Sequence, residues 1–135
     1  MPAYGTLSPM PDFLPPQYNK TLWVGNHNPW AFGFFTNGTS TTTEYPLAGI
    51  RVNVTIYSGD ERLVGKSTAA TPVPTVTVTG SRIDTDITPD DTRIIAAAVA
   101  DGVKPRYEVE FWDGTRETTW VWGTVTLKGG ANDDE

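Results

Sequence analysis

The chain has 135 residues, a formal net charge of −6 and no cysteine. This length suits one domain and leaves no room for a second folded one, while an apolar content of 38% is enough for one sandwich core. The missing cysteines exclude disulfide bonds, thiolate metal sites and a cysteine nucleophile, and the acidic balance argues against a nucleic-acid-binding protein, which needs basic residues to neutralise phosphates.

The first twenty residues predict an extended arm, because five prolines interrupt them and no helical or strand periodicity is present. Prolines lower the entropy lost on ordering, and Tyr4, Phe13 and Tyr18 provide groups with which such an arm can dock. The segment lacks the pattern of a signal peptide, and no apolar run approaches the length of a membrane span. We therefore expect no membrane contact, and synthesis in a cytoplasm with retention there or release by lysis.

Short strands are expected between the arm and the helix. The cleanest covers 50–57, where Ile50, Val52, Val54 and Ile56 alternate with more polar residues. Further candidates lie at 21–24, 30–35, 61–68, 75–79 and 82–87. They are separated by residues that favour turns, mainly glycine, proline, asparagine and serine.

A short helix is expected to begin after Thr88. The Thr88 hydroxyl can cap the first turn, Pro89 suits the first helical position, and Asp90 and Asp91 lie near the positive end of the helix dipole. Gly102 is expected to end the helix. The residues expected to form its apolar face are Ile94, Ile95, Ala98 and Val99.

A long hairpin follows the helix. In the segment 107–112, Tyr107, Val109 and Phe111 alternate with Glu108, Glu110 and Trp112, as in a half-buried antiparallel strand. Asp113-Gly114 then predicts a tight turn, because glycine readily adopts the positive φ that such turns need.

The sequence leaves two registers open for this hairpin. A two-residue turn places Tyr107 opposite Trp120, whereas one bulged residue places Tyr107 opposite Val121. We prefer the bulged register, because it continues the apolar alternation to the end of the strand. Its inner residues are Val121, Gly123, Val125 and Leu127.

In the bulged register, Trp112, Trp120 and Trp122 lie on the outer face of the hairpin. Each tryptophan offers a large apolar area, so leaving several uncovered is unusual. Two explanations remain open, namely cover by the arm or another strand of the same chain, and an intermolecular contact. The expected interface residues are Tyr4, Phe13, Tyr18, Trp112, Trp120 and Trp122.

Residues suited to catalysis or metal binding are scarce. His27 is the only histidine and lies in a turn-rich segment, where a solvated or loop-capping role outweighs a catalytic one. The carboxylates at 84, 86, 90 and 91 could bind a calcium ion, for which oxygen ligands suffice. Their presence is already explained without calcium, because 84 and 86 lie on the solvent side of a strand and 90 and 91 lie at the start of the helix. We therefore expect no enzyme activity, no cofactor and no metal site.

These elements together predict an all-β fold. Seven or eight short strands and one connecting helix are typical of an antiparallel β-sandwich of immunoglobulin-like style. We assign an extended arm to 1–20, the sandwich to 21–128 and an acidic tail to 129–135.

Three segments resemble small immunoglobulin-like domains of tailed-bacteriophage virions, one example being the N-terminal domain of phage baseplate upper proteins. They read GSRIDTDITPDDT (80–92), RYEVEF (106–111) and WVWGTVTL (120–127). Such domains typically end with a strand, a T-P-x-x-T helix start, a G-R-Y-x-Y-x-V strand, a turn and a G-x-V-x-V strand. Here Pro105 replaces the usual glycine, and tryptophans replace smaller residues. The likeness extends more weakly to 50–57 and leaves out the arm.

The resemblance implies a structural, non-enzymatic virion protein. From it we expect a capsid decoration or cement protein, assembled in the bacterial host cytoplasm, whose partners are the major capsid protein or other virion proteins. Copies are expected to associate on the particle, a trimer being one option. A tail or baseplate component is the alternative within this class, and a glycan-binding module is the alternative from another class.

Overall fold

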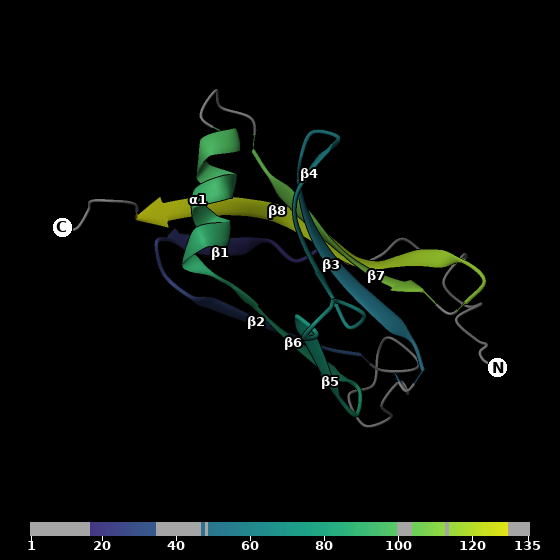
Figure 1. Cartoon of the computed structure of the whole chain (residues 1–135). Helices are drawn as coiled ribbons and strands as arrows, with labels where there is room; N and C mark the ends of the chain where they lie inside the picture. The colour runs from purple at the N-terminus through teal and green to yellow at the C-terminus, as the bar shows by residue number, and fades with distance from the viewer. Residues whose placement is uncertain (1–16, 35–46, 48, 100–103, 113, 130–135) are drawn as a thin grey trace.

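The structure is a computed structural model, and it describes residues 17–34, 47, 49–99, 104–112 and 114–129. These residues form two packed β-sheets with one short helix at an end of the sandwich (Figure 1). The expected fold class, an all-β sandwich with one connecting helix, is confirmed.

The larger sheet has five strands. In spatial order they are β1 (Lys20–Val24), β8 (Glu117–Gly129), β7 (Arg106–Trp112), β3 (Arg51–Ser58) and β4 (Glu61–Ser67). The smaller sheet contains β2 (Asn28–Gly33), β6 (Arg82–Ile87) and β5 (Val76–Thr79). The strand positions expected from the sequence agree with these bounds to within one or two residues at each end.

The strand order is that of an immunoglobulin-like domain. The set β2-β6-β5 corresponds to the B-E-D strands of that fold, and β8-β7-β3-β4 corresponds to G-F-C with one added strand. The expectation of a wholly antiparallel sandwich is wrong in one place, because β1 pairs with β8 in parallel. A parallel strand needs a long connection, and here almost the whole domain lies between β1 and β8.

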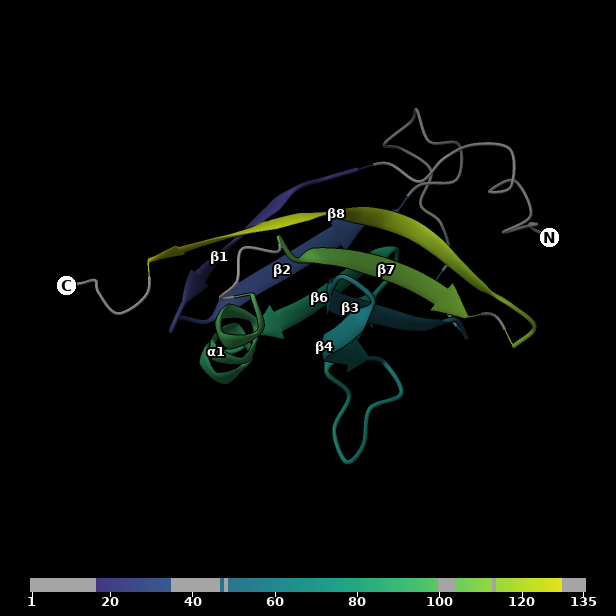
Figure 2. The ribbon, with the colours of Figure 1, turned by 90° about the horizontal axis from the view of Figure 1, so that it is seen from above.

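The two sheets face each other (Figure 2), and the core lies between them, formed by the inward-facing residues of the strands. The largest wholly buried side chains are Tyr107, Phe111, Leu22, Leu47, Ile56, Ile83, Ile87 and Ile95. Aromatic rings join the sheets, since the Tyr107 ring lies 5.1 Å from Trp30 and 5.8 Å from Phe32. Such ring pairs add to the stabilisation that burial alone provides.

The helix α1 (Pro89–Ala98) begins as expected, with Thr88 and Asp91 forming a reciprocal capping box. Its expected apolar face is confirmed at Ile95, which is wholly buried, but is wrong at Ile94, which is 50% exposed, and the other buried helical residue is Thr92. Thr92 can face inward because its hydroxyl donates to the Pro89 carbonyl and accepts from the Gly25 amide. The helix also ends earlier than expected, at Ala98.

Candidate functional site

A β-bulge in the β7–β8 hairpin decides which tryptophans face outward. Val109 lies opposite Val121, and Glu110 lies opposite Thr119, so Trp120 is the additional residue of the bulge. The bulge is therefore within the strand, whereas residues 113–116 connect β7 to β8. The expected pairing of Tyr107 with Val121 is wrong by two residues, because Tyr107 lies opposite Gly123.

Trp120 faces the core rather than the solvent, which corrects the expectation from the sequence. Its ring stacks on Phe111 with the centroids 4.9 Å apart, and it meets Phe34 edge-on at 6.2 Å. A bulge shifts the alternation by one residue, so Trp120 and Val121 turn to the same side. The expected inner residues beyond the bulge are confirmed for Val121, Gly123 and Val125, and Leu127 is partly buried.

Trp112 and Trp122 lie on the outer face of the larger sheet, as expected. Both are half-buried, and each lies opposite a charged residue of the neighbouring strand, since Trp112 pairs with Arg51 and Trp122 pairs with Glu108. The Arg51 guanidinium lies 5.7 Å from the centre of the Trp112 ring. These two tryptophans, with the charged residues between them, form what we call the outer face.

Three carboxylates, Glu108, Glu110 and Glu117, belong to the outer face. The pKa of Glu110 is raised to about 7, mainly by burial and additionally by the nearby carboxylates of Glu117 and Glu108. The amide of Asn53 on β3 donates to Glu117 at 3.4 Å. Glu110 therefore binds a proton near neutral pH, because burial and the neighbouring negative charges disfavour its ionised form.

Arginine and tyrosine side chains border this acidic group. The Arg106 guanidinium pairs with Glu108 at 3.2 Å and lies 5.0 Å from the Tyr57 ring. Burial raises the pKa of Tyr57, with the charges of Glu110 and Glu108 adding to the effect. The outer face therefore combines two half-buried tryptophans with charges of both signs.

The neighbouring edge of the same sheet also has exposed aromatic residues. Tyr18 is 59% exposed and Trp23 is 50% exposed. Tyr18 was expected at an interface, whereas Trp23 was missed, although its place next to the inward-facing Leu22 of β1 would have indicated it. Tyr4 and Phe13 lie outside the described residues.

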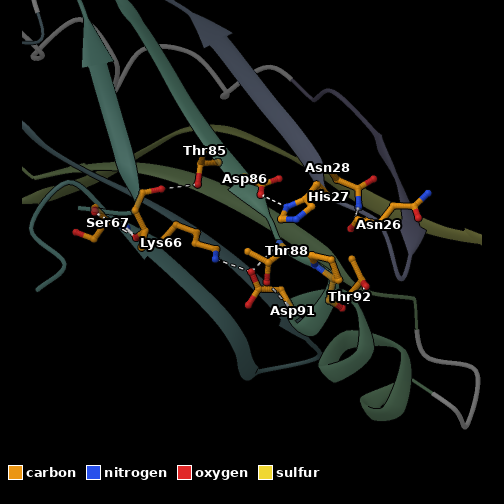
Figure 3. Close-up of polar contacts among 12 residues, drawn as sticks. Asn26, His27, Asn28, Lys66, Ser67, Thr85, Asp86, Thr88, Asp91 and Thr92 are labelled. Carbon is orange, nitrogen blue, oxygen red and sulfur yellow. Dashed lines mark hydrogen bonds and ion pairs between the residues drawn. The ribbon is translucent and has the colours of Figure 1, made fainter. Parts of the chain in front are cut away.

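A second polar region surrounds the start of α1 (Figure 3). Nδ1 of His27 lies 2.6 Å from Oδ2 of Asp86, and this pair joins the turn before β2 to the end of β6. The buried side chain of Lys66 on β4 pairs with Asp91 at 2.5 Å. Burial alone would raise the pKa of Asp91, but hydrogen bonds from Lys66 and Thr88 outweigh it and hold this pKa below its ordinary value.

The carboxylates considered for calcium have cationic partners instead. Asp84 pairs with Arg82 at 2.8 Å, and Asp90 pairs with Arg93 at 2.9 Å. Among the described residues, no group of three or more His, Cys, Asp or Glu side chains is arranged to hold a metal ion. The region around α1 therefore fits a structural role, in which the Lys66–Asp91 ion pair fastens the helix to the larger sheet.

Comparison with protein families and with curated proteins gives no function that can be transferred to this chain. No protein-family model matches the chain, and no curated protein matches it. Within the described ranges, no helix has the length and apolar character needed to cross a membrane.

Proposed function

We propose that this protein is a non-enzymatic structural component of a tailed-bacteriophage virion, and specifically a decoration or cement protein that binds the assembled head and stabilises it. The observation that supports this function best is the placement of Trp112 and Trp122 on the outer face, in the same sheet whose edge strand follows directly from the arm. The likeness of 80–92, 106–111 and 120–127 to small virion domains supplies the biological context.

The exposed aromatic residues provide apolar area that a partner can cover. Covering a whole tryptophan side chain removes roughly 150–250 Å² from water. Because Trp23 is 50% exposed, covering its free half stabilises a complex by about 2–3 kcal/mol at about 25 cal/mol per Å². Trp112 and Trp122 add to this, and the charged groups around them determine which partner surface fits.

The proposed partner is the major capsid protein or another virion protein, and the proposed location is the virion. A cement protein is added after the shell forms and must hold without covalent bonds. An acidic domain with an aromatic face and an N-terminal arm suits both requirements, because the arm and the face can each contribute binding energy. Association of several copies on the particle, as a trimer for example, adds avidity in the same way.

Binding to assembled shells tests this function. We would compare the intact chain, the double variant Trp112→Ala/Trp122→Ala, and a chain lacking residues 1–16. The deletion stops at 16 because Gln17 already pairs with Trp122 on β8. Ile94→Ala serves as a control, since it removes an exposed apolar side chain from the helix, away from the outer face.

We expect the control to bind like the intact chain, and both other variants to show lower occupancy. Undiminished occupancy of the double variant would remove the outer face from the mechanism. Binding of the intact chain to isolated tails instead of heads would favour the tail or baseplate alternative.

A glycan-binding module is the second candidate, because the exposed rings of Tyr18 and Trp23 on a sheet edge can also stack on sugars. Titration of tryptophan fluorescence with host polysaccharides distinguishes it. A saturable change that is lost in Trp23→Ala would favour this function over a protein contact.

A further inference from the structure

The β1 strand forms one edge of the larger sheet. It pairs with β8 on one side, and no strand in the described part of the chain pairs with its other side (Figure 1). Such an edge presents backbone N–H and C=O groups that can bond a strand of another molecule. Whether these groups are free or already bonded therefore determines whether β1 can associate with a second chain.

Alternate residues of β1 direct their backbone groups to opposite sides of the strand. The Tyr18 amide, just before the strand, donates to the Trp122 carbonyl of β8, whereas the Trp23 amide donates to the side chain of Asn28. Because a parallel strand bonds its neighbour through every second residue, Thr21 directs its groups to the same outer edge as Trp23. Thr21 is exposed there.

The side chain of Asn28 takes the place of an added strand at Trp23. Its Oδ1 accepts from the Trp23 amide at 2.9 Å, and its Nδ2 donates to the Trp23 carbonyl at 3.1 Å. Nδ2 also donates to the Asn26 carbonyl at 3.0 Å (Figure 3). Asn28 is only 6% exposed, so water competes little for these bonds. One amide side chain thus bonds both outward backbone groups of Trp23, as the backbone of a neighbouring strand would.

A second feature of β1 also opposes the addition of a strand. Lys20 lies on the inward side of β1, with its ammonium group 4.8 Å from the centre of the Phe32 ring and 5.7 Å from that of Trp30. An inward-facing charge is one of the devices by which natural edge strands avoid pairing with another molecule. A strand added beside β1 would remove further water from this ammonium group, which costs free energy.

We propose that Asn28 closes the β1 edge and so prevents two copies of this chain from pairing through their β1 strands. Such a pair is self-complementary, because antiparallel strands related by a twofold axis at Thr21 place Thr21 opposite Thr21 and Trp23 opposite Asn19 of the other copy. With Asn28 in place, the amide and carbonyl of Trp23 are already bonded, so only the central pair can form. This inference does not depend on the proposed function, because it concerns the free protein.

Removal of the Asn28 side chain tests this inference. We would measure sedimentation of the intact chain and of Asn28→Ala over a range of protein concentrations. Asn28→Ala frees the amide and carbonyl of Trp23 in each copy, so we expect its dimer dissociation constant to be at least about tenfold lower than that of the intact chain. Hydrogen exchange of its Thr21 amide should slow as the concentration rises, because this amide lies at the centre of the pair.

Thr85→Val is the matched control, because it also removes a buried side-chain hydrogen bond. The Thr85 hydroxyl donates to the Thr75 carbonyl at 2.7 Å in the smaller sheet. We expect Thr85→Val to associate no more than the intact chain. Asn28→Ser keeps the experiment informative if Asn28→Ala fails to fold, since its hydroxyl is polar but too short to replace both bonds to Trp23. We expect Asn28→Ser to associate more than the intact chain.

A second substitution identifies the surface through which the copies associate. Thr21 is exposed, so Thr21→Lys leaves the fold intact, and in the paired strands it places two ammonium groups opposite each other. We expect the double variant Asn28→Ala/Thr21→Lys to be monomeric again. Association that persisted in the double variant would involve another surface and would overturn the inference. The inference would also be wrong if the folded Asn28 variants associated no more than Thr85→Val.

Discussion

Replacing Glu110 by glutamine should make the stability of this protein less sensitive to pH. In the folded protein the pKa of Glu110 is raised from 4.5 to about 7, first by burial and then by the charges of Glu117 and Glu108. A carboxyl whose pKa rises on folding disfavours the folded state once it ionises. The destabilisation begins as the pH rises above 4.5, the value expected in the unfolded chain, and is complete above about 7.

The size of this effect follows from the shift. At about 1.36 kcal/mol per pKa unit, the full change corresponds to roughly 3 kcal/mol. Glu110 is only half-buried, so screening by solvent reduces the effect to about 1–2 kcal/mol. Glutamine has a similar shape and no charge, so it removes the repulsion without opening a cavity.

Urea unfolding at several values between pH 5 and pH 9 tests the reasoning. We expect the free energy of unfolding of Glu110→Gln to equal that of the intact chain near pH 5 and to be about 1–2 kcal/mol higher at pH 8. Glu61→Gln is the control, because it removes one exposed carboxylate at the start of β4, away from the group around Glu110. If the two chains differed in free energy of unfolding by the same amount at every pH in this range, the assignment of the proton to Glu110 would be wrong.

Three further predictions concern packing and the helix. Trp120→Ala should destabilise the fold by about 2–3 kcal/mol, because the ring packs on Phe111, while Trp122→Ala should cost less than about 1 kcal/mol, as measured by urea unfolding. Lys66→Ala leaves Asp91 without its cation and should cost about 3 kcal/mol at pH 7. The loss of stability in Lys66→Ala should become smaller in acid, because the ion pair stabilises the fold above pH 3.8 and this stabilisation is lost as the pH falls through the lowered pKa of Asp91. An equal loss of stability at pH 3 would contradict this prediction. Thr88→Ala should cost about 1 kcal/mol through loss of the cap, with a matching loss of helical circular dichroism.

The features predicted correctly from the sequence are those that depend on near neighbours in the chain. The alternation within β3 and β7 requires only that one face of each strand be apolar, and both strands follow it. The N-cap at Thr88 depends on residues within one turn of the chain, so its recognition needs no knowledge of the fold.

The features that the sequence did not reveal involve contacts between distant segments. The Trp120 error arose because the bulge lies inside β8, and its position depends on how β7 and β8 fit together rather than on the turn between them. The apolar face of the helix was partly misplaced because Thr92, a polar residue, finds its partner at Gly25, 67 positions away. Nothing in the local pattern around Thr92 indicates that partner.

For this protein, the sequence alone determined the all-β composition, the helix start and the presence of aromatic residues on the last hairpin, because alternation and capping are local properties. Only the tertiary structure decided that Trp120 packs inward, that β1 joins the sheet in parallel, and that Gly123 lies against the backbone of Tyr18. The physical reason is that a shift of one residue in strand pairing reverses which side chains face the core, and packing between strands far apart in the chain sets that shift.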